Sequence, residues 1–227
     1  KLVNQITKND FRTYGISKVD EVNNKIYFNA TGKSSVESHL FVVNMNGQNQ
    51  EQLTHTSGWH RVTVSPSCDY FIDQFSSFNN SGEMKLFNSK GKVIKELGEL
   101  KKDINQEKGF KVEFFTIPST DGFDLPAFWV LPPNFDKDKK YPVIFDIYGG
   151  PDAGGVYNRF RNYTWDPIYE EGVIRFTVDH RGSGKFGKKG LDYLHRSLGE
   201  WEIHDYIEAV KWLEEKSFVN GDKIGIQ

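Results

Sequence analysis

A tyrosine at the end of an apolar run, followed by a glycine-rich turn, is the segment of this sequence best suited to chemistry. Tyr148 closes the run Val143–Tyr148, and Gly149, Gly150 and Pro151 come directly after it. Ligands meet parallel sheets at the carboxyl ends of their strands, and a phenol there can donate a hydrogen bond to a developing oxyanion. The residues alone favour a second interpretation, a strand-end tyrosine whose ring packs and whose hydroxyl is hydrated.

A second glycine-rich segment follows the apolar run Val173–Val178. Gly182–Gly187 matches the dinucleotide-binding pattern G-x-G-x-x-G. In a nucleotide site the glycines follow the strand directly and an acidic residue ends a strand about 20 residues later. Here other residues intervene and no such acid follows, so the sequence argues against a nicotinamide or flavin site.

The same segment contains the residue types of a catalytic triad. Asp179, His180 and Ser183 are too close in sequence to converge easily, and Ser183 lies outside any G-x-S-x-G turn. We therefore predict a structural turn in which Asp179 and Arg181 make hydrogen bonds.

Neither the histidines nor the cysteine has the spacing of a metal site. No H-x-x-x-H or H-E-x-x-H pattern occurs among His39, His55, His60, His180, His195 and His204. Cys68 is the single cysteine, which excludes a disulfide within the chain, and its strand-like surroundings predict a small buried side chain. We expect no metal and no cofactor.

The charges do not select a partner. The 29 basic and 31 acidic side chains are spread along 227 residues and give a net charge of −2, so we expect no nucleic-acid partner. No apolar run approaches the roughly 20 residues of a membrane span, and Lys1–Gln5 does not resemble a signal peptide. The compartment is therefore left open.

Residues 1–97 contain short strands in a repeating order. Gly47 and Gly91 mark equivalent turns and Leu53 and Leu97 equivalent strand ends, and both pairs are 44 residues apart. That period is typical of a four-stranded propeller blade, although two unrelated β-meanders are the alternative. Because two blades cannot close a ring, we expect the chain to be a piece of a longer protein.

Residues 98–110 are polar and predict a linker, and the character of the sequence changes after it. Residues 111–118 and 125–131 predict a strand pair, and apolar runs at 143–148 and 173–178 predict buried strands. Residues 162–171 look helical, a second helix carries an apolar stripe, and a last strand starts at Lys223. The stripe consists of Ile203, Ile207, Val210 and Leu213. Residues 111–227 therefore predict a mostly parallel α/β sheet that is interrupted at its last strand.

Taken together, these segments resemble the dipeptidyl peptidase IV branch of the prolyl oligopeptidase family, in the family's order. Blade-like matches are Ile26–Phe28, Glu37–Phe41, Gly47, Leu53, Thr54, Gly58, His60, Ser65, Pro66, Tyr70, Phe71, Asp73 and Ser76. Matches in the second half are Asp146–Pro151, Asp179, Arg181–Gly184, Leu198, Gly199, Glu202, Asp205 and Ala209.

The resemblance implies the last blades of an eight-bladed propeller followed by an α/β-hydrolase domain that stops before its nucleophile turn. It implies release of dipeptides from peptide N-termini after proline or alanine, with Tyr148 as the oxyanion donor. The serine, aspartate and histidine of the family and its amine-binding glutamates have no match here, so we expect these 227 residues alone to be inactive. A non-catalytic binding relative, a prolyl endopeptidase and an acylaminoacyl peptidase remain alternatives.

The resemblance also bears on partners and location. It implies a peptide substrate and a homodimer. It suggests a secreted, periplasmic or membrane-anchored protein, since these are the settings of the family.

Overall fold

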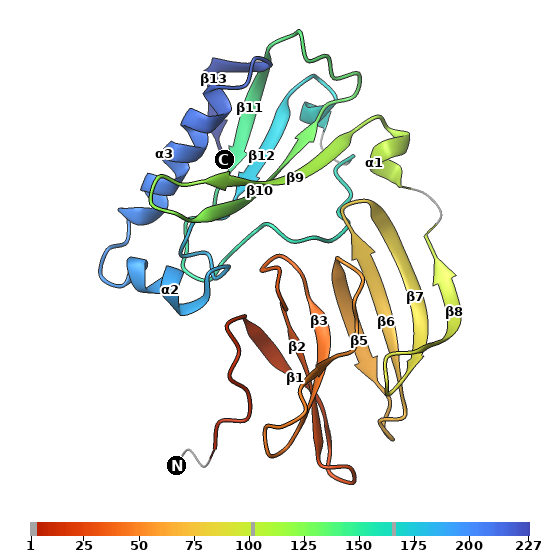
Figure 1. The fold of residues 1–227 in the computed structure, drawn as a ribbon. Coiled ribbons are helices and arrows are strands. Elements are labelled where there is room, and N and C mark those ends of the chain that lie inside the picture. Colours follow the sequence, from red (N-terminus) through yellow and green to blue (C-terminus); the bar gives the residue numbers. More distant parts are fainter. Residues whose placement is uncertain (1–3, 101–102, 165–166) are drawn as a thin grey trace. The chain divides into compact units, whose positions relative to one another are not determined.

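The computed structural model describes residues 4–100, 103–164 and 167–227, which form two compact units (Figure 1). The first unit holds the described residues up to 100 together with residues 157–160. The second unit holds the described residues from 103 to 156 and from 161 onward. The sequence placed the short segment 157–160 in the second domain, whereas its contacts place it in the first unit.

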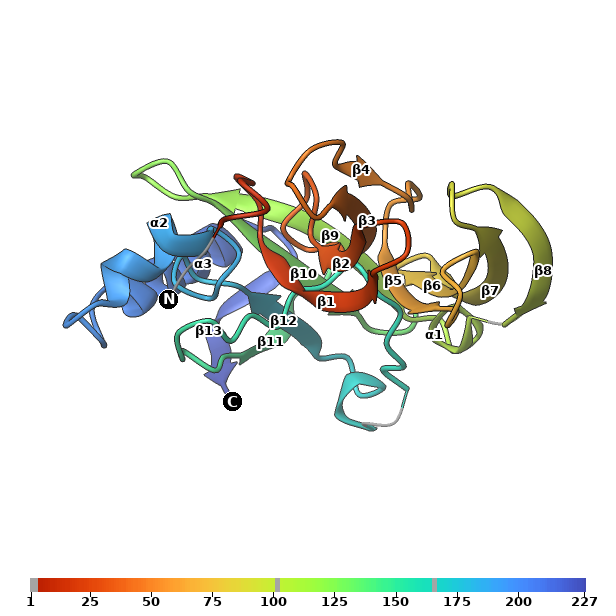
Figure 2. The same cartoon turned by 90° about the horizontal axis from the view of Figure 1, so that it is seen from below.

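The first unit contains two antiparallel sheets of four strands each, and each sheet follows chain order from edge to edge. Figure 1 and Figure 2 both show this order for β5 to β8. The first sheet consists of β1 (Thr13–Asp20), β2 (Lys25–Ala30), β3 (His39–Asn44) and β4 (Glu51–Gln52). The second consists of β5 (Trp59–Val64), β6 (Tyr70–Ser77), β7 (Asn80–Asn88) and β8 (Val93–Glu99).

The predicted 44-residue repeat is confirmed in the pairing of the last two strands of each sheet. Phe41 pairs with Gln52 in the first sheet, and Lys85 pairs with Glu96 in the second, which is the same pairing displaced by 44 residues. The turn between the strands repeats as well, because Gly47 N donates to Asn44 O and Gly91 N donates to Asn88 O. The two sheets are therefore two copies of one blade.

The two turn glycines are required by both conformation and space. Gly47 has φ +84° and Gly91 has φ +74°, a region that disfavours side chains. A Cβ atom on Gly47 would lie 2.8 Å from Ile6 O, and one on Gly91 would lie 2.7 Å from Leu53 O. Each glycine thus lets the segment that enters its blade pass close to the turn.

Side chains of both blades share one apolar core. Tyr27, Leu40 and Leu53 from the first blade pack with Phe71 from the second and with the buried Cys68, as predicted for the cysteine. Leu97, the repeat partner of Leu53, is instead 43% exposed on β8, the outer edge strand of its sheet. Equivalent positions in the repeat therefore have different environments.

The segment 157–160 completes the first unit by bonding to both blades through Asn158. Asn158 N donates to Val36 O at 2.8 Å, and its Nδ2 donates to Ser57 Oγ at 3.1 Å. Its Oδ1 accepts from Phe78 N at 3.1 Å, in the turn between β6 and β7. Its Nδ2 also donates to Glu37 Oε1 at 3.3 Å, between β2 and β3, so one asparagine from late in the sequence joins loops from both blades.

The second unit is built on one five-stranded sheet in the order β13-β11-β12-β10-β9. Strands β12, β11 and β13 run parallel, and the antiparallel strands β10 and β9 complete the sheet. The bounds are β9 (Lys111–Pro118), β10 (Asp124–Leu131), β11 (Tyr141–Asp146), β12 (Ile174–Val178) and β13 (Val219–Ile226). Short helices are α1 (Ile104–Glu107), α2 (Gly187–Leu191) and the 3-10 turns η1 (Pro167–Tyr169) and η2 (Asp192–Leu194), and α3 (Trp201–Glu214) is the long one.

The prediction of a helix over residues 162–171 is wrong for the residues that the structure describes. Residues 162–164 are irregular and only η1 is helical, while positions 165 and 166 lie outside the described residues. Asn162 Oδ1 accepts from Thr164 N and Oγ1, and Tyr163 N donates to Asn105 Oδ1. Side chains of asparagine and threonine that bond nearby backbone compete with helix formation.

The predicted helix with Ile203, Ile207, Val210 and Leu213 exists as α3, but its buried face differs from the apolar stripe. Ile203 and Ile207 are each 50% exposed, whereas Glu202, Asp205, Ala209 and Leu213 are buried. Asp205 faces inward because it pairs with the buried Arg181, as the next section describes, and Glu202 accepts a hydrogen bond from Gly199 N. Among the described residues no helix combines the length and the apolar character needed to cross a bilayer.

Candidate active site

Tyr148 lies at the carboxyl edge of the sheet, directly after β11. The strand ends at Asp146, two residues earlier than predicted, and the next residue, Ile147, bonds the end of the chain after β13. Ile147 N donates to Gln227 O and Gln227 N donates to Phe145 O, each at 3.1 Å. The end of the parallel strand β13 is therefore beside the residue that precedes Tyr148.

The side chain of Tyr148 is 80% exposed and rests against its own turn. A Cβ atom built on Gly150 would lie 2.4 Å from Cε1 of the Tyr148 ring. The ring therefore covers the space that a side chain at position 150 would occupy. Gly149 has φ +76°, which a glycine adopts without strain. Both glycines of the motif thus serve the placement of Tyr148.

One side chain from another element bonds the backbone of this turn, and a second lies close to it. Gly149 N donates to the Tyr206 hydroxyl Oη at 3.1 Å, and Tyr206 comes from α3. His180, after β12, lies close to the backbone of Gly150, which favours the charged form of its ring. The Tyr206 ring also packs edge-on against Phe145 and His180. No local pattern in the sequence marks Tyr206, because 57 residues separate it from Gly149.

Burial sets the protonation of both groups. It raises the pKa of Tyr206 to about 12, so its hydroxyl stays protonated at neutral pH. Burial lowers the pKa of His180, although the backbone of Gly150 and nearby carboxylates act in the opposite direction. His180 Nδ1 faces Gly182 N at 3.2 Å, which fits a neutral ring that accepts at Nδ1 and carries its proton on Nε2.

The sequence argued against a triad of Asp179, His180 and Ser183, and the structure agrees, because the Asp179 carboxylate bonds backbone groups instead. Asp179 accepts from Gly155 N at 2.6 Å and from Val156 N at 3.0 Å, and it lies 3.6 Å from Lys185 Nζ. The carboxylate therefore fixes the loop after Tyr148.

Arg181 is fully buried and is the centre of an ion-pair network. Its backbone N and its guanidinium donate to Asp205 on α3, and the guanidinium also donates to Asp121 in the turn between β9 and β10. Three aromatic rings surround the guanidinium, at 4.5–4.9 Å from their centroids. They belong to Phe123, Tyr193 and Trp201. The predicted structural role of Arg181 is confirmed, and its two acidic partners are new.

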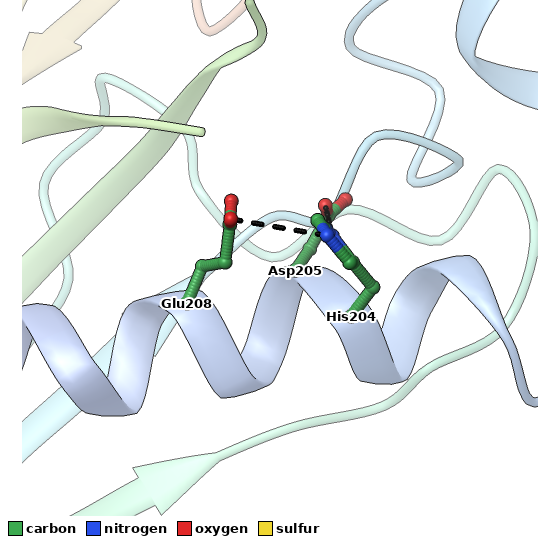
Figure 3. A group of neighbouring side chains, drawn as sticks. All are labelled: His204, Asp205 and Glu208. Atoms are coloured by element: carbon green, nitrogen blue, oxygen red, sulfur yellow. Dashed lines mark hydrogen bonds and ion pairs between the residues drawn. The ribbon is translucent and has the colours of Figure 1, made fainter. Parts of the chain in front are cut away.

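His204, Asp205 and Glu208 form a cluster of potential metal ligands on α3 (Figure 3). Asp205 accepts from Arg181 on both oxygens, and Arg181 Nη2 lies 3.2 Å from His204 Nδ1. Glu208 accepts from the backbone N and the Oγ1 of Thr120. A cation here would lie against a guanidinium and would displace these bonds, so the cluster is a hydrogen-bonded network rather than a candidate metal centre.

Two family models match the chain and together cover most of it. The model described as the dipeptidyl peptidase IV N-terminal region matches residues 1–81, and the prolyl oligopeptidase family model matches residues 158–227. A probable dipeptidyl-aminopeptidase B from Podospora anserina is 32% identical over 218 residues, and one from Arthroderma benhamiae is 33% identical over 219 residues. Each alignment covers 92% of this chain and 23% or 24% of the relative, so the chain spans about a quarter of the length of these relatives.

Solved structures match the chain over almost its whole length. Dipeptidyl peptidase 4 from Porphyromonas gingivalis superposes with a TM-score of 0.85 at 23% identity, over 99% of this chain and 32% of that one. A putative dipeptidyl aminopeptidase IV from Bacteroides ovatus superposes with a TM-score of 0.86 at 30% identity, over 98% of this chain and 32% of that one. The expected fold, propeller blades followed by the start of an α/β-hydrolase sheet, is confirmed.

Proposed function

The chain belongs to the dipeptidyl peptidase IV branch of the prolyl oligopeptidase family, and from this we propose that the intact protein is a serine peptidase. It releases dipeptides with proline or alanine in second position from the N-termini of peptides, through an acyl-enzyme. In this proposal residues 1–97 are propeller blades, 98–110 a linker and 111–227 the first half of the catalytic domain.

The observation that carries the proposal is the placement of Tyr148 at the carboxyl edge of the sheet. Its phenol is 80% exposed, so substrate can reach it, and its turn is bonded to α3. In the family the strand matching β13 leads to the nucleophilic serine, and the end of β13 bonds to Ile147. Tyr148 is therefore suited to donate a hydrogen bond to the oxyanion that forms when a serine attacks the substrate carbonyl.

The proposal assigns one catalytic group to residues 1–227. The sequence contains no G-x-S-x-G segment, and Glu170, Glu171 and Ser183 take no role of the missing groups. We therefore expect the 227-residue polypeptide alone to leave peptide bonds uncut.

The test uses the protein expressed from its full reading frame. A Gly-Pro chromogenic amide should be hydrolysed, and a phosphonofluoridate should abolish the activity by blocking the serine. Tyr148→Phe should lower kcat at least ten-fold with the fold intact, since one oxyanion donor contributes about 2.7–4 kcal/mol at the upper end. An intact protein that is inactive on this amide would point to a binding relative, and cleavage only within longer peptides would point to an endopeptidase.

A further inference from the structure

We propose that Tyr206 is a positioning residue for the reaction: its hydroxyl holds the turn that carries Tyr148. This inference rests on the proposed role of Tyr148. Tyr206 itself is assigned no contact with substrate, because its hydroxyl accepts the backbone N–H of Gly149 at 3.1 Å inside the protein.

The Tyr148 turn is held at its two ends, where Ile147 N donates to Gln227 O and Asp152 N donates to Gly182 O. Between these ends the constraints are few, which is why one side-chain hydroxyl matters. Tyr148 is exposed, Gly149 has a positive φ, and Gly150 has no side chain. Short glycine turns have many accessible conformations, so an outside bond is needed to select one. Tyr206 supplies that bond at Gly149.

The ring of Tyr206 is packed between buried groups, so its hydroxyl has a fixed position and can fix the position of Gly149. Its ring packs edge-on against Phe145, at 5.4 Å between centroids, and against His180 at 5.6 Å. Phe145 is fully buried on β11, and α3 is anchored one residue earlier by Asp205 and its bonds to Arg181. The chain of contacts therefore runs from the sheet core and the buried arginine through Tyr206 to Gly149.

Oxyanion stabilisation depends closely on where the donor lies, so a shift of the Tyr148 hydroxyl should affect the reaction. A donor must lie about 2.7–3.1 Å from the position of the oxyanion, and small misplacements cost catalysis without weakening substrate binding. Loss of the Tyr206 hydroxyl leaves Gly149 N unpaired and frees the turn. We therefore expect kcat to fall while KM stays constant.

The experiment is a double-mutant cycle in the protein expressed from its full reading frame. Tyr206→Phe should lower kcat about three- to ten-fold, the range expected for one lost hydrogen bond. In the Tyr148→Phe background the same substitution should have no further effect, because its action passes through the Tyr148 phenol. Equal effects of Tyr206→Phe in both backgrounds would overturn the inference while leaving the role of Tyr148 intact.

Tyr141→Phe is the matched control. The Tyr141 hydroxyl also accepts a backbone N–H, from Asp136 at 2.9 Å, but at the opposite end of β11. Tyr141→Phe should leave kcat unchanged. This result would show that the effect of Tyr206→Phe comes from its bond to Gly149 and not from the loss of any tyrosine–backbone bond in the second unit.

Hydrogen exchange of a peptide covering residues 147–152 gives a readout that needs no activity. Tyr206→Phe should speed exchange of this segment and Tyr141→Phe should not. Unchanged exchange in Tyr206→Phe overturns the inference whatever the kinetics show. Faster exchange together with a Tyr148→Phe enzyme of normal kcat refutes the catalytic role of Tyr148, and the proposed role of Tyr206 in the reaction falls with it.

Discussion

Gly150 has no room for a side chain, because the ring of Tyr148 lies over it. We expect Gly150→Ala to displace the ring and lower kcat at least ten-fold in the intact protein, by an effect comparable to loss of an oxyanion donor. Gly155→Ala is the control in the same loop, since its nearest neighbour would be Thr177 Cγ2 at an ordinary 3.5 Å. Normal turnover in Gly150→Ala would show that the position of the ring is unimportant.

His180 makes the second unit sensitive to acid. Its pKa in the folded protein lies below the unfolded value of about 6.5, because burial disfavours the charged ring. Stability is therefore complete above about pH 6.5 and falls as the pH drops, since the unfolded chain takes up the proton first. We expect the unfolding free energy to decrease from pH 7 to pH 5, as measured by denaturant titration.

Substitution of the histidine tests this assignment. His180→Asn should reduce the pH dependence between 7 and 5, whereas a substitution of the exposed His195, His195→Gln, should retain it. An unchanged slope in His180→Asn would assign the acid sensitivity to other groups.

The sequence reveals Tyr148 but not the residue that holds it. A strand end followed by Gly-Gly-Pro is a local pattern, so the candidate can be found by reading neighbouring residues. The partner of Gly149 lies 57 residues away on a helix, and a tyrosine in an amphipathic helix resembles any other packing aromatic. Only the path of the chain between β11 and α3 brings the two together.

The network around Arg181 connects elements of the second unit through polar side chains. It ties the β9–β10 turn, the segment after β12 and α3 to one fully buried guanidinium. We expect Asp205→Asn to destabilise the unit by about 3–5 kcal/mol, because removing one partner leaves a buried charge uncompensated. Asp121→Asn should cost less, because the Asp121 side chain is 34% exposed and water can replace it. Thermal unfolding of the two variants checks the order, and equal losses would contradict it.

The blade turns provide a second test at this scale. Gly91→Ala adds strain at φ +74° and a contact of 2.7 Å with Leu53 O, so we expect a loss of about 1–3 kcal/mol in the first unit. Gly98→Ala in the same blade is the control, because no atom lies within 4 Å of its Cβ position. Equal melting temperatures for the two variants would show that the turn can adapt.

These elements differ in how far the sequence specifies them. The blade repeat was predictable because its signal is periodic and each turn depends on residues next to it, as Gly47 and Gly91 show. The face of α3 was not, because the apolar stripe of Ile203 and Ile207 competes with the need of Arg181 for Asp205. Leaving a buried charge unpaired costs more free energy than exposing half of two isoleucine side chains. Hydrophobic periodicity contains no information about that electrostatic cost.

At the scale of the whole molecule, the polypeptide passes between its two units three times. It leaves the first unit near residue 100, returns for residues 157–160 and leaves again. We expect Asn158→Ala to destabilise the first unit, by about 1–3 kcal/mol, because it removes the side-chain bonds to Glu37, Ser57 and Phe78. Asn162→Ala, in the second unit, should leave that unfolding transition unchanged. A first unit insensitive to Asn158→Ala would show that the blades need no later segment.

The return of residues 157–160 to the blades also has a consequence for synthesis. Domains usually fold in the order in which they emerge from the ribosome. Here the two blades are finished only after strands β9, β10 and β11 and the loop behind β11 have been translated. During synthesis the pair of blades is therefore incomplete while the next domain is being translated. Ser57 and the β6–β7 turn lack their hydrogen bonds to Asn158 until that residue has emerged.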